Sequence, residues 1–138
     1  MSDLADDIIE LLISTAHGMQ QRSYAPYSGF NVGAALLSKS GKIYGGCNIE
    51  NAAYSPSNCA ERTAIFKAVS EGEKEFRAIA IVGGKKGETG DLCFPCGVCR
   101  QVMAEFCDPD TFKIIMRDSG GQTVIKSLRD LLPEAFRL

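Results

Sequence analysis

The hydrophobic pattern at the start of the chain has the period of an amphipathic helix. From Leu4 to Met19 the apolar residues recur every three or four positions, which places them on one face of a helix. Ser2 is available as an N-cap, and three Asp residues at positions 3, 6 and 7 complement the positive end of the helix dipole. We expect this helix to cover a hydrophobic core and to carry no chemistry.

Beyond this helix, short apolar runs alternate with helical segments. The pattern predicts strands at 30–37, 42–48, 78–82 and 112–116, and helices from Cys59 to near Gly72, from Cys96 through Phe106 and at 128–132. The run at 78–82 is apolar throughout, as expected for a central strand covered on both faces. This alternation predicts an α/β fold with helices on both sides of a sheet. Without a repeat or a linker, residues 1–138 are expected to form one domain.

Composition and charge narrow the function classes. With 45% apolar and 23% charged residues, the chain is typical of a globular protein. A formal charge of −2 offers no general basic field, so we expect no nucleic-acid partner. The N-terminus is acidic where a secretory signal would be basic, and no apolar run reaches the length of a membrane span. We therefore expect a cytoplasmic protein with no membrane partner.

Six Cys without an export signal favour metal or thiol chemistry over a disulfide framework. The one histidine, His17, belongs to the N-terminal helix and is expected to be structural, so any zinc site must be rich in thiolates. Cys59 and the Cys96-x-x-Cys99 pair both open helical segments, whose positive ends favour thiolates. Together these three sulfurs predict one metal site.

The residues next to these sulfurs suggest catalysis. Zinc with three protein ligands holds a water molecule and lowers its pKa, whereas a closed four-ligand site is structural. Glu61 stands two residues after Cys59, close enough to carry protons in a hydrolytic deamination without binding the metal. Three thiolates leave the zinc site with a formal charge of −1. We hypothesise that Arg62 and Arg100 offset this charge by hydrogen bonding to the sulfurs.

The stretches Cys59-Ala60-Glu61 and Pro95-Cys96-Gly97-Val98-Cys99 resemble the zinc-dependent nucleoside and nucleobase deaminases. Over nearly its whole length the chain looks like a cytidine deaminase of the short, homotetrameric, all-cysteine type. The segments that carry this resemblance are 27–36, 46–54, 59–65, 95–102 and 131–136. The resemblance implies a three-layer α/β/α sandwich around a mixed five-stranded sheet. It also implies hydrolytic deamination of cytidine and deoxycytidine to uridine and deoxyuridine, with release of ammonia, in pyrimidine salvage.

The same resemblance assigns individual residues. Zinc, one ion per chain, would be bound by Cys59, Cys96 and Cys99, with Glu61 as the proton shuttle. Asn48 and Glu50 would hold the ribose hydroxyls, Phe30 would line the pyrimidine pocket, and the backbone of Ala60 with the Glu61 side chain would read the pyrimidine edge. Neighbouring subunits of a homotetramer would complete each site with Tyr54 and Phe136, and Tyr27 looks like an interface residue.

Read without the resemblance, several of these residues have simpler interpretations. Asn48 and Glu50 are ordinary turn residues, Phe30 is a strand residue facing a core, and Phe136 is a C-terminal anchor. Cys47 and Cys107 are expected to pack as small apolar residues.

The chain departs from the family pattern at Cys93-Phe94, where a small residue such as Ser is more usual before Pro95. Cys93 adds a second Cys-x-x-Cys, although we expect it not to bind the metal. A purely structural zinc module would need a fourth ligand, for which Cys93 is the nearby candidate.

Other substrates stay open: tRNA, single-stranded DNA or a nucleotide such as dCMP, and an antibiotic cytosine nucleoside. A Glu50 that binds ribose hydroxyls would repel a 3′-phosphate, and the acidic chain has no obvious electropositive groove, so a free nucleoside is the favoured small-molecule substrate.

Overall fold

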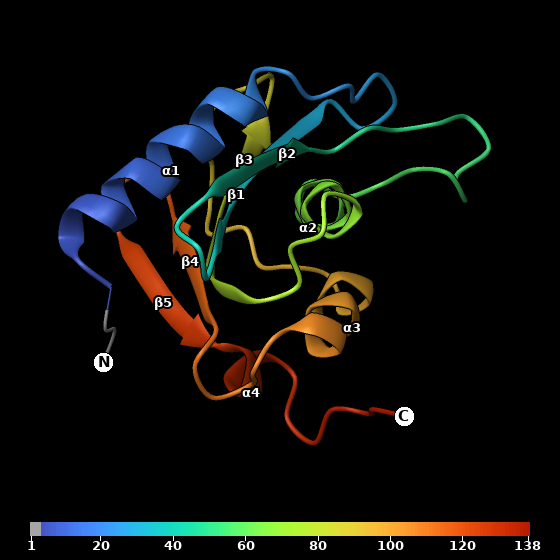
Figure 1. Ribbon diagram of the computed structural model, residues 1–138. Helices are drawn as coiled ribbons and strands as arrows, with labels where there is room; N and C mark the ends of the chain where they lie inside the picture. Colours follow the sequence, from blue (N-terminus) through green and yellow to red (C-terminus); the bar gives the residue numbers. More distant parts are fainter. Residues whose placement is uncertain (1–3) are drawn as a thin grey trace.

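The computed structural model describes residues 4–138, and its centre is a mixed five-stranded sheet (Figure 1). The strands are β1 (Phe30–Ser38), β2 (Ile43–Cys47), β3 (Phe76–Lys85), β4 (Lys113–Arg117) and β5 (Thr123–Ser127). Their order across the sheet is β2-β1-β3-β4-β5. The β3–β4 pair is parallel and the three other pairs are antiparallel.

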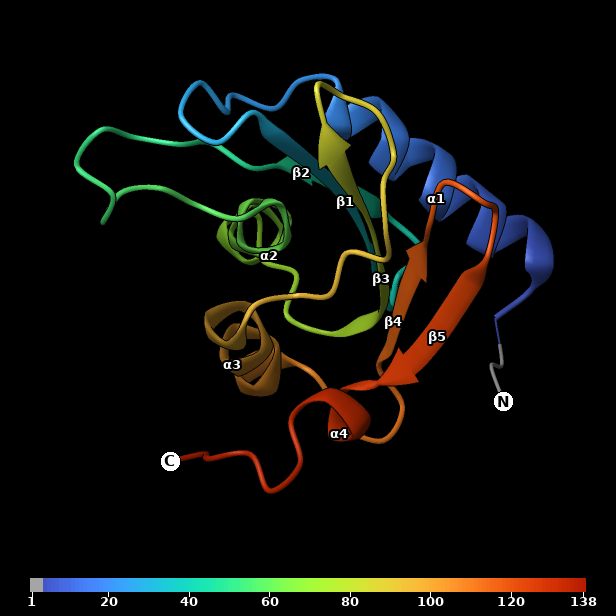
Figure 2. The same ribbon diagram turned by 180° about the vertical axis from the view of Figure 1, so that it is seen from behind.

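Helices cover both faces of the sheet. Helix α1 (Asp6–Gln20) lies on one face, while α2 (Ala60–Ser70) and α3 (Gly97–Phe106) lie on the other; Figures 1 and 2 show the two sides. The short α4 (Leu128–Leu131) follows β5. This arrangement confirms the three-layer α/β/α sandwich and the mixed five-stranded sheet.

The sheet separates two hydrophobic clusters, and the central strand β3 contributes to both. Ala78, Ala80 and Val82 face the α1 side, whereas Ile79 and Ile81 face α2 and α3. All five residues are buried. The apolar run at 78–82 is therefore a central strand covered on both faces, as predicted. Full burial of one large aliphatic side chain contributes roughly 1.5–3 kcal/mol.

Two glycines allow the helices to pack closely on the sheet. A Cβ atom added at Gly33 in β1 would lie 1.9 Å from the carbonyl oxygen of Ala16 in α1. At Gly46 in β2, an added Cβ would lie 2.5 Å from the carbonyl oxygen of Ala60 and 2.5 Å from the amide nitrogen of Ala64. The small residues of these strands therefore accommodate α1 and α2.

Three details differ from the sequence prediction. Helix α1 begins at Asp6, with Ala5 as an N-cap that makes no side-chain capping bond; Ser2 lies outside the described residues. Strand β3 extends beyond the predicted 78–82 at both ends. Strand β5 follows the turn at 118–121 and was missed, because only Val124 and Ile125 are apolar on this half-exposed edge strand.

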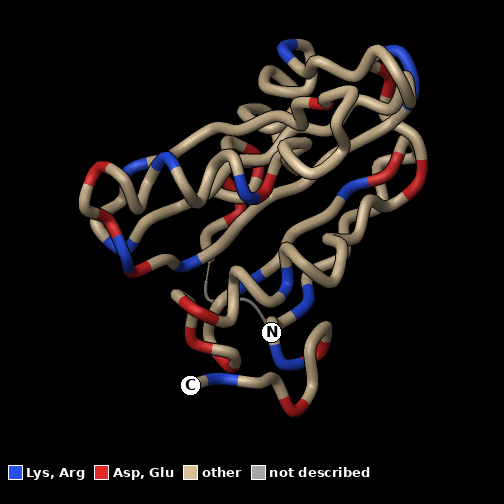
Figure 3. The backbone as a smooth tube through the Cα atoms, turned by 90° about the vertical axis from the view of Figure 1, so that its right-hand side faces the viewer, with Lys and Arg blue, Asp and Glu red and all other residues tan. Residues whose placement is uncertain are grey.

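The charged residues show no segregation by sign along the chain. Figure 3 shows Lys and Arg interspersed with Asp and Glu from one end of the molecule to the other. Within residues 4–138, no helix combines the length and the apolar character needed to cross a membrane.

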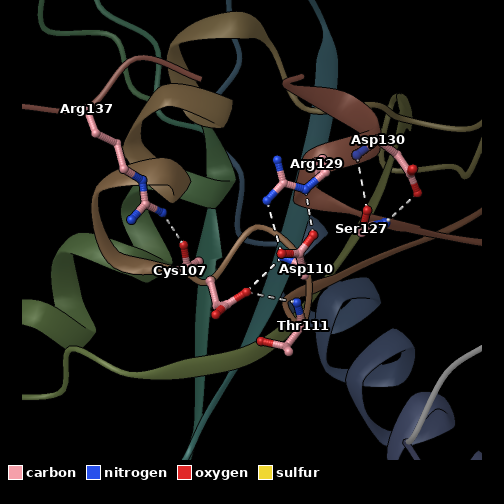
Figure 4. Close-up of polar contacts among 8 residues, drawn as sticks. Cys107, Asp110, Thr111, Ser127, Arg129, Asp130 and Arg137 are labelled. Atoms are coloured by element: carbon pink, nitrogen blue, oxygen red, sulfur yellow. Dashed lines mark hydrogen bonds and ion pairs between the residues drawn. The ribbon is translucent and has the colours of Figure 1, made fainter. Parts of the chain in front are cut away.

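A polar network fixes the C-terminal segment (Figure 4). Ser127 caps α4, because its Oγ accepts from the amide of Asp130 at 3.1 Å and its own amide donates to Asp130 Oδ2 at 3.0 Å. The Arg129 guanidinium donates to the Asp110 carboxylate, and Arg137 Nη2 donates to the Cys107 carbonyl at 2.6 Å. The predicted N-cap at Ser127 is confirmed, and the chain after α4 is held beside α3.

Candidate zinc centre and active site

The three matched cysteines lie where α2 and α3 begin. Cys59 is the N-cap of α2, Cys96 is the N-cap of α3, and both have extended backbones. Cys99 follows within the first turn of α3 and is buried. The free N–H groups and the dipole at a helix N-terminus favour a thiolate over a thiol. Both helices therefore direct their positive ends toward the same group of sulfurs.

The spacing of these sulfurs suits zinc. Cys59 Sγ and Cys96 Sγ are 3.8 Å apart, and Cys96 Sγ and Cys99 Sγ are 3.4 Å apart. All three sulfurs lie within 4.8 Å of one another. A tetrahedral ion with Zn–S bonds of about 2.3 Å requires sulfur separations of about 3.8 Å. The donor set fits Zn²⁺ with three protein ligands and a fourth position that no described side chain of the cluster occupies.

Hydrogen bonding makes the Cys59 thiol more acidic than the Cys99 thiol. The pKa of Cys59 is lowered to about 5, chiefly by the hydrogen bond with Cys99 and also by Arg62, and burial opposes this shift. The same hydrogen bond and burial raise the pKa of Cys99. The site therefore holds one thiolate readily, and a bound dication would favour loss of the remaining thiol protons.

Of the two arginines expected to donate hydrogen bonds to the sulfurs, Arg62 does so. Arg62 Nη2 donates to Cys59 Sγ at 3.3 Å, across one turn of α2. Burial lowers the pKa of Arg62, but its hydrogen bonds to Cys59 and Cys99 outweigh that effect and raise it.

For Arg100 the prediction is wrong. Its Nε donates to the Pro95 carbonyl at 2.7 Å, and its Nη1 donates to the Leu131 carbonyl at 2.7 Å. Arg100 thus ties the start of α3 to the C-terminal segment instead of binding a sulfur.

Glu61 lies beside the sulfurs in the first turn of α2. Its side chain is buried, with 4% of the residue exposed. Burial raises the pKa of Glu61 to about 7; a hydrogen bond with its own backbone opposes this shift, the charge of Cys59 adds to it, and a hydrogen bond from Cys99 also opposes it. The carboxylate therefore contacts the sulfur cluster from within the same helix that presents Cys59.

Asn48 is held rigidly just after β2. Its Oδ1 accepts from the Val32 amide at 2.9 Å and from Ser23 Oγ at 2.5 Å, and its Nδ2 donates to the Phe30 carbonyl at 2.8 Å. Three contacts fix the orientation of the amide, leaving one Nδ2 proton for another acceptor. The contribution of Ser23 was not anticipated from the sequence.

Glu50 is oriented by the turn before β1. Its Oε1 accepts from the amides of Tyr27 at 2.9 Å and Ser28 at 3.1 Å, and its Oε2 accepts from Ser28 Oγ at 2.5 Å. The Ser28 hydroxyl is the main cause of the lowered pKa of Glu50. Ser28 was missed as a functional residue, although its place in the turn-rich stretch that matched the family was a usable signal.

Two of the remaining predicted residues begin a strand or a helix, and the other two are strongly exposed. Phe30 begins β1 with 39% of its surface exposed, and Ala60 is the first, buried residue of α2. Tyr54 and Phe136 are 80% and 66% exposed. Tyr54 belongs to the loop between β2 and α2, which Figure 1 shows extending away from the sheet, and it shares a groove of about 320 Å³ with Glu50.

The other cysteines do not join the cluster. Within residues 4–138 the group of side chains able to hold a metal consists of Cys59, Cys96 and Cys99, without Cys93. Cys47 and Cys107 are buried in the core as expected. Burial, together with the nearby charges of Glu61 and Cys59, raises the pKa of Cys93 to about 12.

Comparison with known proteins identifies the family. Residues 7–115, which include all three zinc-ligand candidates, match the model for the cytidine and deoxycytidylate deaminase zinc-binding region. The chain belongs to this deaminase family. Among curated family members it is 48% identical to a cytidine deaminase from Sporosarcina psychrophila, over 93% of this chain and 90% of that protein.

Other relatives agree in fold. A crystal structure of cytidine deaminase from Burkholderia pseudomallei superposes with a TM-score of 0.84 at 47% identity, and the match covers 92% of this chain and 98% of that one. A blasticidin-S deaminase from Bacillus cereus is 34% identical, over 75% of this chain and 74% of that protein.

Proposed function

We propose that this protein is a zinc-dependent enzyme that hydrolyses cytidine and deoxycytidine to uridine and deoxyuridine, with release of ammonia, in pyrimidine salvage. The observation that carries the proposal is the buried carboxylate of Glu61 beside three sulfurs spaced for zinc. Family membership and the cytidine deaminases at 47–48% identity support the same reaction.

Cys59, Cys96 and Cys99 would hold the metal. When bound by three protein ligands, Zn²⁺ supplies the Lewis acidity that makes water a nucleophile near neutral pH. Arg62 would keep Cys59 deprotonated and offset part of the negative charge of the sulfurs through its 3.3 Å hydrogen bond.

Glu61 would move the protons of the reaction. Its carboxylate takes a proton from the attacking water and delivers it to N3 of the pyrimidine while the C4–O bond forms. A second proton from the added hydroxyl then passes through Glu61 to the exocyclic nitrogen. The C4–N bond breaks and ammonia leaves, so one carboxylate acts in turn as base and acid.

The residues around this centre would position the nucleoside. Asn48 and Glu50 would bind the ribose hydroxyls, Phe30 would contact the pyrimidine, and the backbone of Ala60 would read its edge together with Glu61. The hydrogen bonds that Asn48 and Glu50 already make support this role, because they fix both polar groups before a ligand arrives.

A homotetramer would complete each site, with Tyr54 and Phe136 contributed by neighbouring subunits and Tyr27 at an interface. Support comes from their exposure, since Tyr54, Phe136 and Tyr27 are 80%, 66% and 61% exposed. A second apolar surface lies over α2 and α3, where Phe66 and Val98 line a groove. Exposed apolar surface of this kind suits contact between protein subunits.

A free nucleoside fits better than a nucleotide or a polynucleotide. The Glu50 carboxylate, kept ionised by Ser28, would repel a phosphate near the ribose. The interspersed charges in Figure 3 likewise show no continuous basic stretch along the described chain. The blasticidin-S deaminase relative makes an antibiotic cytosine nucleoside the second candidate substrate.

The proposal also includes the domain organisation and the location of the protein. Residues 1–138 would act as one domain. In support, the two hydrophobic clusters pack on opposite faces of the same central sheet. A cytoplasmic location would keep the thiol ligands reduced.

The test is the loss of amino-pyrimidine ultraviolet absorbance with purified, zinc-loaded protein. Cytidine, deoxycytidine, dCMP, blasticidin S and an oligonucleotide are compared as substrates. Turnover of cytidine and deoxycytidine supports the proposal. Turnover confined to dCMP and the oligonucleotide, or to blasticidin S, would contradict it.

A further inference from the structure

A missing side chain on β3 brings two residues together next to the zinc centre. A Cβ atom added at Gly83 would lie 2.9 Å from Cys93 Sγ, 3.2 Å from Phe30 Cε2 and 3.2 Å from Val32 Cγ2. The Cys93 thiol and the Phe30 ring therefore both lie over the bare backbone of Gly83. We call Gly83, Cys93, Phe30 and Val32 the Gly83 wall.

The Gly83 wall faces the layer that holds the sulfurs. Alternate residues of β3 point to opposite faces of the sheet, and Ile79 and Ile81, which precede Gly83 at this spacing, pack toward α2 and α3. Val32 and Cys93 pack against the same cluster. The wall thus lies on the face of the sheet that α2 and α3 cover.

Cys93 also lies close to the reacting end of the site. The charges of Glu61 and Cys59 both act on its thiol, so Cys93 lies near these groups as well as near the Phe30 ring. Burial favours the neutral thiol, which offers a small, polarisable and weakly hydrogen-bonding surface. A neutral surface of this kind suits the contact of an uncharged heterocycle.

We infer that Cys93, which shares the space over Gly83 with Phe30, forms part of the wall that contacts the pyrimidine base and limits the size of base that the site accepts. This inference rests on the proposed function. It gives the second Cys-x-x-Cys a role in substrate fit: Cys93 contacts the base, and Cys96 contacts the metal.

Enlargement of Cys93 tests this role. In Cys93→Met, Gly83 and Phe30 leave no room for the longer side chain on their side. We therefore expect the Met side chain to extend into the space for the base. We expect the KM for cytidine and the inhibition constant of uridine to rise about tenfold or more, with one zinc per chain retained. Cys93→Ser keeps the size and should stay within about threefold of wild type in both constants.

Cys107→Met is the matched control, because Cys107 is a buried cysteine of the core cluster against which the partly buried Cys93 packs. Cys107 follows the C-terminal end of α3, whereas Cys93 precedes its N-terminal end. The KM of Cys107→Met should stay near the wild-type value even if its stability falls. If Cys93→Met had the wild-type KM for cytidine and the wild-type inhibition constant for uridine, the inference would be overturned. Loss of zinc from Cys93→Ser would also overturn it, because Cys93 would then be a metal ligand.

A labelling experiment on the wild-type protein covers the case in which Cys93→Met does not fold. Zinc-loaded protein is treated with methyl methanethiosulfonate, and modified peptides are followed by mass spectrometry. Saturating uridine should slow the modification of Cys93 by at least about fivefold, and it should not change the rate at which Cys107 is modified. Equal rates with and without uridine would overturn the inference. Failure of the wild type to turn over any cytosine nucleoside would instead overturn the proposed function.

Discussion

Arg62 Nη2 donates a hydrogen bond to Cys59 Sγ at 3.3 Å, so the helix that presents the first sulfur also supplies a cation to it. Cys59 caps α2 and Arg62 lies one turn later. The helix dipole and the guanidinium act in the same direction, because each favours the thiolate. This pairing offers a way for a site of three thiolates to keep its metal acidic.

Arg62→Gln should weaken the site in two measurable ways. A charge-assisted hydrogen bond contributes about 1.5–3 kcal/mol when it is well shielded from water. Because Arg62 is only half-buried, we expect a loss at the lower end of this range, which corresponds to a decrease of about tenfold in both the zinc affinity and kcat. Competition with a chromophoric chelator measures the zinc affinity. Arg77→Gln, at an exposed position of β3, is the control and should change neither value. If Arg62→Gln matched wild type in both, the role of Arg62 would be wrong.

Ser28→Ala should impair the binding of the ribose and leave the chemistry intact. The variant loses the hydroxyl that donates to Glu50 Oε2 at 2.5 Å, so the carboxylate is less firmly oriented and the KM for cytidine should rise about tenfold with little change in kcat. With 2′,3′-dideoxycytidine, which lacks the hydroxyls, Ser28→Ala and wild type should have similar KM values. An equal defect on both substrates would contradict the role of Glu50.

Two glycines near the end of α1 should respond in opposite directions to the same change. Gly33→Ala places a Cβ 1.9 Å from the Ala16 carbonyl, and because backbone cannot yield easily, the free energy of unfolding should fall by about 3 kcal/mol or more. Gly18→Ala meets nothing within 4 Å inside α1 and should stabilise the protein by about 0.5–1 kcal/mol. Urea denaturation measures both changes, and a neutral Gly33→Ala would show that α1 packs less closely than described.

The sequence predicted the cluster of three sulfurs able to hold a metal, because the spacing that brings these sulfurs together is largely local. Cys59 and Cys96 each begin a helix, and the Cys-x-x-Cys spacing brings Cys99 onto the same turn as Cys96. Side-chain direction was not predictable in this way. Arg100 is next to Cys99 in sequence, yet it binds the Pro95 and Leu131 carbonyls.

The fold was predictable where burial was strong and less so at the edge of the sheet. The middle of strand β3, residues 78–82, is continuously apolar and was found. Strand β5 has only Val124 and Ile125 between the polar residues Thr123 and Lys126, and it was missed. The roles of Ser23 and Ser28 depend on contacts 25 and 22 residues away in the sequence. Neither contact has a local signature beyond that of an ordinary turn.

Mixed oligomers should reveal whether neighbouring subunits complete the site. Glu61→Gln chains lack the proton shuttle, and Tyr54→Ala chains lack an aromatic ring that is 80% exposed in the isolated chain. If Tyr54 serves another subunit, a Glu61→Gln chain can supply its intact Tyr54 to the site of a Tyr54→Ala chain. Co-refolding the two variants should then restore deamination well above the sum of the separate activities. Strictly additive activity would indicate that each chain builds its own site.

The most direct measurement of the central claim is the zinc content and the activity of Glu61→Gln side by side. The variant keeps the three sulfurs and is nearly isosteric, so it should retain one zinc per chain. Its kcat for cytidine should fall by a factor of about 100 or more, the scale of general acid–base catalysis. Retained zinc with near-wild-type turnover, or loss of the zinc itself, would contradict the account.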